Sequence, residues 1–273
     1  MIRLLTNADK GIIQEYIDRN HMETTFLFGN VEHYGIDNTD KTLFRCGDYY
    51  GYFDRQSLKG IIPFYNLGSC IPHFEDDKAL PEIIDLVKNQ KTFTYLIGVE
   101  KVIKPIYEAI KDYRTTKENN KSSYMLNNNF TPFTAQDTII YDATTEERFI
   151  DFIAESDKDS HRDRAREEVI SSITQKSPDE DFLLLEKEGK LVSQACIQAV
   201  TSRFNQIGAV FTLPEERGKG YAKTVVSELC ERIIDRNKIP SLFVRKNNTP
   251  AVKAYQSLGF KHYMDYLFIV FEK

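Results

Sequence analysis

The sequence predicts two α+β domains, each built on a mixed β-sheet with helices packed against it. Three observations support this fold class. In the second half of the chain, strand-like and helix-like hydrophobic patterns alternate throughout. At Val210–Ala222 an apolar run is followed by a glycine-containing loop and then by an amphipathic helix. The first half shows a similar succession of patterns, so we expect a second, smaller domain there.

The elements of the first half are expected as helices near 8–18, 77–89 and 101–112, with strands near 42–46, 50–54, 58–65, 67–72 and 93–98. The segment 113–137 is polar and rich in turn residues, apart from the apolar Tyr124–Leu126. Its polar part Lys117–Lys121 is expected to be a surface connection. We therefore place an N-terminal domain at 1–132 and a C-terminal domain at 133–273.

The elements of the second half follow in a regular order. Helices are expected at 144–155, 161–174, 218–236 and 249–257, and strands at 138–142, 181–187, 191–200, 204–212, 241–245, 260–263 and 266–272. The turn Glu188–Lys190 joins two of these strands into a hairpin.

The composition is that of a globular protein. The chain has 273 residues, of which 41% are hydrophobic and 28% charged. Its net charge of −5 and the lack of a Lys/Arg block argue against nucleic-acid binding. No apolar run is long enough to cross a membrane, and the N-terminus does not resemble a secretory signal. Four dispersed cysteines and five histidines show no metal-ligand spacing, so no metal is expected. Cys230 is read as a packed thiol.

A strand, a glycine-containing loop and a helix N-terminus together form a site for an anion. Glycines let the backbone approach a phosphate, while uncapped N–H groups and the helix dipole direct positive charge at it. The loop is not a P-loop, because Tyr221 rather than Lys follows Gly220. It is not the dinucleotide fingerprint either, because Lys223 misses the third position.

What remains is the pattern R-x-x-G-x-A at Arg217, Gly220 and Ala222, followed later by N-T-P-A-V-K-A-Y-Q-S-L-G-F at Asn248–Phe260. In this order and spacing, the two segments resemble the GNAT N-acetyltransferases. Members of that family carry the pyrophosphate loop first and then N-x-x-A-x-x-x-Y-x-x-x-G-F. Every fixed position of the second pattern is met, at Asn248, Ala251, Tyr255, Gly259 and Phe260.

The resemblance implies a GNAT fold for the C-terminal half and acetyl-CoA as co-substrate. Val210, Phe211 and Thr212 would offer the free backbone groups of a splayed strand to the pantetheine and to the thioester carbonyl. The pyrophosphate would be bound, mainly by backbone N–H groups, at Arg217, Gly218, Lys219, Gly220, Tyr221 and Ala222. Asn248 corresponds to the family's cofactor-contacting Asn and also suits a helix N-cap.

Tyr255 resembles the family tyrosine beside the coenzyme A sulfur. A phenol with a pKa of ~10 can donate a proton to a thiolate of comparable basicity, which is the role of a general acid. The alternative for Tyr255 is a core-facing aromatic residue on its helix.

The general base is not predicted by the sequence, because Phe204–Leu213 contains no carboxylate. Gln198, Gln206 and Thr212 are too weakly basic. The helix pair offers Glu155, Asp157, Asp159 and His161, in a charged run that is more typical of a solvated face. Proton transfer through water is a further alternative, because amines with a pKa below about 9 need little help at neutral pH. The acceptor pocket is expected between this helix pair and the last hairpin, with His262, Tyr263, Asp265 and Tyr266.

The first half lacks this chemistry, since Glu75, Asp76 and Asp77 stand near the place of the glycine loop. Carboxylates there would repel a pyrophosphate. We expect either a degenerate second copy of the fold or an unrelated α+β domain.

The function expected from the resemblance is transfer of an acetyl group from acetyl-CoA to a primary amine of a small molecule. Two alternatives are acetylation of a protein or peptide, and a non-catalytic acyl-CoA-binding sensor. A cytoplasmic monomer or homodimer is expected, with neither nucleic acid nor membrane as a partner.

Overall fold

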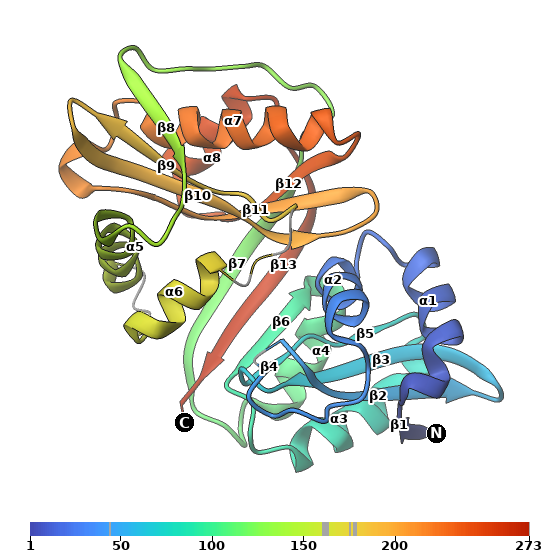
Figure 1. The fold of residues 1–273 in the computed structure, drawn as a ribbon. Helices are drawn as coiled ribbons and strands as arrows, with labels where there is room; N and C mark the ends of the chain where they lie inside the picture. The colour runs from blue at the N-terminus through green and yellow to red at the C-terminus, as the bar shows by residue number, and fades with distance from the viewer. Residues whose placement is uncertain (44, 160–163, 175, 177–178, 273) are drawn as a thin grey trace. The chain divides into compact units, whose positions relative to one another are not determined.

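The computed structural model describes residues 1–43, 45–159, 164–174, 176 and 179–272 (Figure 1). The chain divides into two compact units, Met1–Ser123 with Met264–Lys273, and Tyr124–Tyr263. These limits differ from the expected ones, because the end of the chain belongs to the first unit. A functional boundary between residues 132 and 133 stays a prediction.

In the first unit the strands follow the order β1-β2-β3-β4-β6-β13-β7, with β5 paired to β3. From β1 to β13 the pairs are antiparallel except β4 with β6. Its elements are β1 (Ile2–Leu4), the 3-10 helix Asn7–Asp9, α1 (Lys10–Arg19), α2 (Thr25–Tyr34), β2 (Gly47–Asp54), β3 (Ser57–Tyr65), β4 (Ser69–Cys70), β5 (His73–Phe74), the 3-10 helix Asp77–Ala79, α3 (Leu80–Asn89), β6 (Tyr95–Val99), α4 (Glu100–Ile110), most of β7 (Thr116–Leu126) and the end of β13 (Lys261–Phe271).

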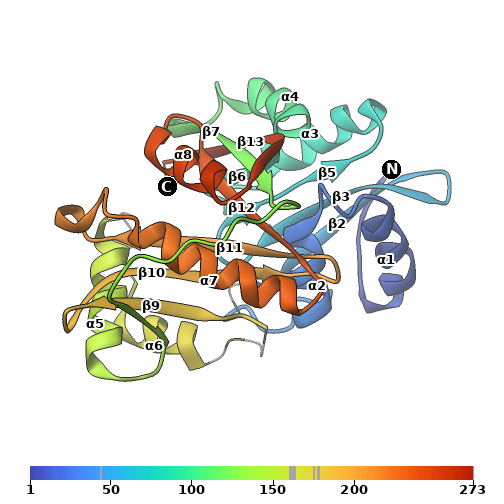
Figure 2. The same cartoon turned by 90° about the horizontal axis from the view of Figure 1, so that it is seen from above.

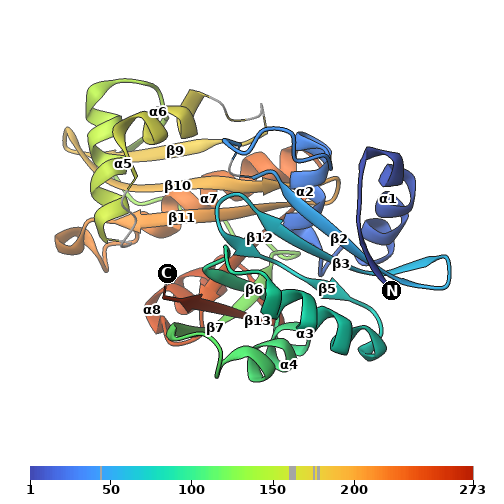
Figure 3. The same ribbon diagram turned by 90° about the horizontal axis from the view of Figure 1, so that it is seen from below.

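Helices cover both faces of this sheet. Buried side chains of α1 and α2, such as Ile13 and Phe28, form one core with Tyr49 and Ile61 of the sheet. Helices α3 and α4 lie on the other face (Figures 1 and 3). Each presents an apolar stripe, since Ile83 and Val87 of α3 and four residues of α4 are buried.

The second unit has a sheet in the order β12-β11-β10-β9-β8. Its pairs are antiparallel except the parallel pair β11 with β12. Its elements are the end of β7, β8 (Thr138–Asp142), α5 (Glu147–Asp159), α6 (Arg166–Thr174), β9 (Phe182–Lys187), β10 (Lys190–Val200), β11 (Phe204–Thr212), the 3-10 helix Pro214–Glu216, α7 (Tyr221–Asp235), β12 (Ile239–Arg245), α8 (Thr249–Ser257) and the start of β13.

Two hydrophobic cores sandwich the second sheet. The larger core joins α7 and α8 to one face, with Val225, Leu229 and Tyr255 among its members (Figure 2). The other core joins α5 and α6 to the opposite face through Phe149, Ile153 and other residues (Figure 3). The end of β7 adds Met125, which is 1% exposed, to the larger core. We refer below to the two sides of this sheet as the α7 face and the α5 face.

The two units repeat one succession of elements. In each, a strand and two helices precede a run of antiparallel strands, a helix, a strand in parallel pairing, a second helix and a last strand; the run is β2 to β5 in the first unit and β9 to β11 in the second. The parallel pairs β4 with β6 and β11 with β12 occupy corresponding places. The first half is therefore a second copy of the same topology, and the alternative of an unrelated domain is wrong.

Several expected elements were wrong. The stretch 117–121, expected as a surface connection, is part of the eleven-residue strand β7. Its exposure alternates from residue to residue, so polar side chains fill the outward positions of a real strand. The strand expected at 50–54 is present but begins earlier, as β2 (Gly47–Asp54), whereas the described residues of 42–46 form no strand. The strand β1 and the helix α2 were not expected at all.

Candidate functional site

A gap between two parallel strands is the central feature of the second unit. Within the described strands, the pairing of β11 with β12 ends at Ile207 and Leu242, although β11 continues to Thr212 and β12 to Arg245. The backbone N–H and C=O groups of β11 that face β12 beyond Ile207 therefore have no strand to bond. Gly208, Ala209 and Val210 are partly exposed. Such an edge can take an extended ligand by hydrogen bonding, as an added strand would.

A β-bulge accounts for the gap. Gln194 of β10 faces Phe211, but Cys196 faces Gly208, so two residues of β11 stand opposite Ala195. One of them, Ala209, has a φ of +49°. A non-glycine residue with this φ is strained, and a bulge bends its strand and strengthens its twist. The bulge thus directs the end of β11 away from β12. Val210, Phe211 and Thr212 are the last residues of β11, beyond its pairing with β12, and their contact with a cofactor stays a prediction.

The loop after β11 has the features of an anion site. Gly218 and Gly220 have φ values of +82° and +90°, which favour glycine. Gly220 is the N-cap of α7, and within the described residues no side chain caps this helix and no acidic residue lies in its first turn. The first backbone N–H groups of a helix have no partner inside the helix. The start of α7 therefore presents positive charge that no acidic side chain of its first turn offsets.

The residue that the sequence analysis took as the start of the C-terminal domain, Phe133, lies against this loop. A Cβ on Gly220 would come within 3.0 Å of the Phe133 ring. The ammonium of Lys223 lies 3.6 Å from the ring centroid. The segment is held on α7 because the N–H groups of Phe133 and Ala135 donate to the hydroxyls of Ser227 and Thr224, each at 2.9 Å. Sequence reasoning missed this contact because Phe133 stands in a polar stretch.

The charged side chains of the loop already have partners. Arg217 donates from Nε to the Thr212 carbonyl at 3.1 Å, which ties the loop to the end of β11. Lys219 pairs with Glu216 at 2.8 Å and is about half exposed. In this arrangement the side chains of Arg217 and Lys219 stabilise the loop. The backbone groups of Gly218, Gly220, Tyr221 and Ala222 remain as the main positive features.

The second motif lies on α8. Asn248 is the N-cap, and its side chain accepts from the Ala251 N–H at 3.3 Å, as expected. Tyr255 is 7% exposed and packs in the larger core, edge-on to Phe260. Burial raises the pKa of Tyr255 above its usual value near 10. The phenol is therefore protonated at neutral pH and able to donate a hydrogen bond, but the raised pKa makes it a weaker proton donor than a free tyrosine.

The candidate bases of the helix pair have different surroundings. Asp157 is buried and pairs with Arg164 at 2.7 Å, which neutralises it. Glu155 is exposed on α5. His161 and the side chain of Asp159 lie outside the described part of the structure. The α5 face instead carries the buried amide of Gln194, which the sequence analysis did not single out. A polar residue inside the apolar strand pattern of β10 was the available signal.

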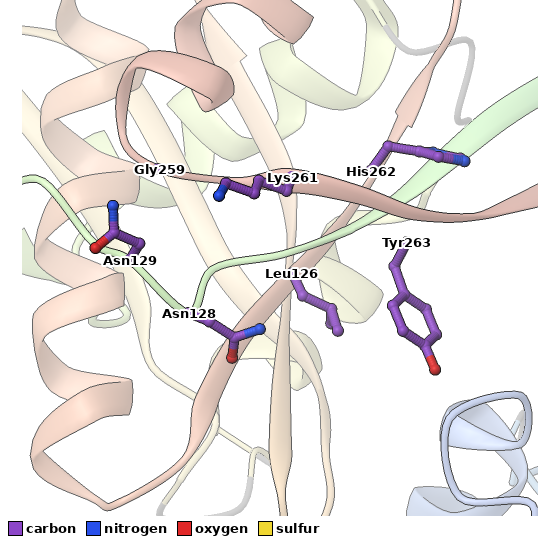
Figure 4. A pocket seen from close by; sticks show the side chains of 7 residues that line it. All are labelled: Leu126, Asn128, Asn129, Gly259, Lys261, His262 and Tyr263. Carbon is purple, nitrogen blue, oxygen red and sulfur yellow. The ribbon is translucent and has the colours of Figure 1, made fainter.

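The expected acceptor residues are also separated. His262 and Tyr263 line a pocket of about 130 Å³ with Leu126, Asn128, Asn129, Gly259 and Lys261 (Figure 4). In Figure 4 Lys261 extends toward Asn129, whereas His262 extends the other way. Asn127, between the lining residues Leu126 and Asn128, donates its N–H to the Pro240 carbonyl at the start of β12. The ring of Tyr263 approaches that of Tyr124, which stacks on Phe243 further along β12. Asp265 and Tyr266 belong to the other unit.

The corresponding place in the first unit is built differently. Where the second unit has its glycine loop, Asp76 caps a 3-10 helix by accepting from the Lys78 N–H at 2.9 Å. Glu75 pairs with Arg19 and Lys59. The loop is thus acidic and already capped. On β5, the buried His73 lies between the Tyr16 hydroxyl at 2.6 Å and Glu23 at 2.9 Å.

The described residues were also compared with the requirements of a metal site, a membrane span and a reactive thiol. Among the described residues, no group of three or more His, Cys, Asp or Glu side chains is placed to hold a metal ion. Across the same residues, no helix combines the length and apolarity that a membrane span requires. All four cysteines are free thiols, and burial raises the pKa of Cys230, as expected of a packed core residue.

Comparison with known proteins agrees with this geometry. Residues 187–269 match a protein family described as FR47-like protein. A stretch of 81 residues is 32% identical to the beta-lysine N(6)-acetyltransferase of Methanosarcina mazei, and it spans 29% of this chain and 30% of that protein. A GCN5-related N-acetyltransferase from Sphaerobacter thermophilus matches with a TM-score of 0.63 at 12% identity, over 98% of this chain and 94% of its own. A tandem GNAT protein from the clavulanic acid biosynthesis pathway matches with a TM-score of 0.61 at 10% identity, over 98% and 97%.

These matches show the fold of the protein. The whole chain has the fold of the GNAT acetyltransferases, in a tandem arrangement of two such units. The resemblance to this superfamily is confirmed, with sequence similarity over residues 187–269 and similarity of fold over both units.

Proposed function

We propose that the chain transfers the acetyl group of acetyl-CoA to the primary amine of a small molecule. The observation that carries the proposal is the bulged end of β11, free of β12, followed directly by the Gly218–Gly220 loop at the start of α7. The pantetheine arm would pair with Val210, Phe211 and Thr212, and the pyrophosphate would meet the backbone N–H groups from Arg217 to Ala222. The similarity to acetyltransferases and the two sequence motifs support the same assignment.

The reaction needs no covalent enzyme intermediate. A neutral amine attacks the thioester carbon, a C–N bond forms and the C–S bond breaks. A backbone N–H of the unpaired stretch of β11 would stabilise the negative charge on the carbonyl oxygen. The Tyr255 hydroxyl would protonate the departing thiolate, and the amine would lose its proton to water. Acetyl-CoA and four free thiols fit a reducing cytoplasm.

Release of free thiol from acetyl-CoA across a panel of amines, peptides and buffer tests the proposal. We expect thiol release with at least one small primary amine, together with the mass of the acetylated product. Turnover only with peptides would support a protein acetyltransferase. Binding of acetyl-CoA with no turnover on any amine would support a sensor and contradict the proposal.

Replacing Tyr255 with Phe should lower kcat with little change in acetyl-CoA affinity. The hydroxyl acts on a thiolate that forms only as the C–S bond breaks, so it contributes in the transition state. We expect a loss on the order of 10–100-fold, measured as thiol release at saturating substrates. Tyr113→Phe removes a hydroxyl from a residue that is 71% exposed in the other unit and serves as the control. Full turnover in Tyr255→Phe would make Tyr255 a packing residue.

A further inference from the structure

The side chain of Gln194 is held in one orientation beside the bulge. It is 1% exposed. Its Nε2 donates to the Ser156 hydroxyl of α5 at 2.8 Å and approaches the Ala209 carbonyl at 3.5 Å. Because a backbone carbonyl can only accept, the amide nitrogen must face Ala209. The oxygen of the amide is therefore fixed on the other side.

That oxygen, Oε1, is buried and has no hydrogen-bond partner among the described residues. Buried amide oxygens almost always have a partner, so an unpartnered one calls for an explanation. The hydrogen bonds of Nε2 do not explain why an amide oxygen is present, since a serine or threonine at this position could also donate to the same groups. The oxygen is best explained as an acceptor for a ligand N–H.

The position of Gln194 identifies the ligand group. Its contact with Ser156 places the side chain on the α5 face, and its contact with Ala209 places it at the bulge. Cys196, which packs against the core of the α5 face, is partly exposed, as are Gln198 and Gly208 beside the bulge. The side chain of Gln198 lies over Gly208 so closely that a Cβ there would be 1.9 Å from its Oε1. The amides of Gln194 and Gln198 thus both lie beside the bulge, where the proposed function would hold the acetyl group.

We propose that Gln194 positions the acceptor: its Oε1 accepts a hydrogen bond from an N–H of the amine that attacks the acetyl carbon at the bulge of β11. The inference rests on the proposed function. An amine that points its lone pair at the carbonyl carbon directs its N–H groups away from it, toward acceptors on the α5 face. An amide oxygen orients such an N–H but is too weakly basic to remove a proton. Gln194 is thus a positioning residue, and the proton leaves by another route.

Steady-state kinetics of the full-length Gln194→Met variant test this role. Met fills a similar volume without polar atoms. We expect kcat/KM for the amine to fall roughly 10- to 100-fold, the range typical of one lost hydrogen bond to a charged or reacting group. The Kd of acetyl-CoA should stay within about 3-fold, and Tm should change little, because removal of an unpartnered buried oxygen offsets the loss of the Nε2 hydrogen bond. Ser156→Ala, which releases Nε2 but keeps Oε1, should give a smaller loss in the same direction.

Asn205→Leu is the matched control. Asn205 is also a fully buried amide without partners among the described residues, but it lies where β11 still pairs with β12. This variant should change Tm and leave the KM of the amine unaltered. Wild-type amine kinetics in Gln194→Met would overturn the inference, as would a parallel loss of acetyl-CoA affinity and Tm. If Gln194→Met does not fold, wild-type amine kinetics in Ser156→Ala would overturn it. If the wild-type protein itself releases no thiol, the proposed function fails instead.

Discussion

Gly220→Glu is expected to abolish acetyl-CoA binding. Gly220 has a φ of +90°, and a side chain there would meet the Phe133 ring at 3.0 Å. The new carboxylate would also stand at the start of α7, where the proposed site binds phosphates. The carboxylate and the phosphates would repel each other. The carboxylate would also compete with the phosphates for the backbone N–H groups at the start of α7. We expect the Kd, measured by isothermal titration calorimetry, to rise at least about 100-fold, which corresponds to about 2.7 kcal/mol.

Gly189→Glu is the control for this substitution. Gly189 has a similar φ of +79° in the hairpin between β9 and β10, and a Cβ there would meet nothing within 4 Å. Both variants carry the same backbone strain and the same added charge. Only Gly220→Glu should lose binding. Unchanged acetyl-CoA affinity in Gly220→Glu would contradict the proposal that this loop binds the pyrophosphate.

A fragment of residues 133–273 is expected not to fold into a binding-competent protein, whereas residues 124–263 should. The fragment 133–273 lacks Tyr124–Leu126. In the full chain Tyr124 stacks on Phe243, and Met125 belongs to the larger core. The same fragment also carries Met264–Lys273, which the structure assigns to the first unit. There, Tyr266–Val270 pair with β6, and both Ile269 and Phe271 are buried. Without β6 these apolar side chains would be exposed and would favour aggregation.

Fragment complementation distinguishes a fragment that fails because it lacks its partner strands from one that is merely poorly expressed. Residues 1–132 and 133–273, produced together, contain every strand of both sheets. Co-expression should restore a soluble complex that binds acetyl-CoA, as judged by size-exclusion chromatography and titration. A soluble, monomeric 133–273 fragment with the affinity of the full chain would show that this half needs neither β7 nor β6 in order to fold. It would then favour the boundary between 132 and 133.

The sequence predicted the second unit better than the first for a physical reason. Its loop depends on glycines at positive φ and on a helix start, which a short pattern of residue types can reveal. The strand β7 was missed because T-K-E-N-N-K-S-S contains no apolar residue, and strand patterns are recognised by alternating apolar positions. Pairing with neighbouring strands determines the structure of such a segment, and a single sequence does not contain that information.

The chemistry of the acceptor side was harder to predict than the cofactor loop. The bulge depends on Ala209 in a conformation that alanine rarely adopts, so its residue type gave no signal. The charged run on α5 was a poor guide, since Asp157 is used in an ion pair with Arg164. Gln194 stood unnoticed in the strand L-V-S-Q-A-C-I, because the burial of one polar side chain follows from packing against Ser156.

Hydrogen–deuterium exchange with and without saturating acetyl-CoA is the most direct test of the central claim, that the chain has one acetyl-CoA site in the second unit. The account predicts slower exchange at the backbone N–H groups of 208–212 and 218–224. It predicts no change at 73–82, the corresponding segment of the first unit, where the loop is acidic and already capped. Protection at 73–82, or bound acetyl-CoA with no protection at 208–224, would contradict it.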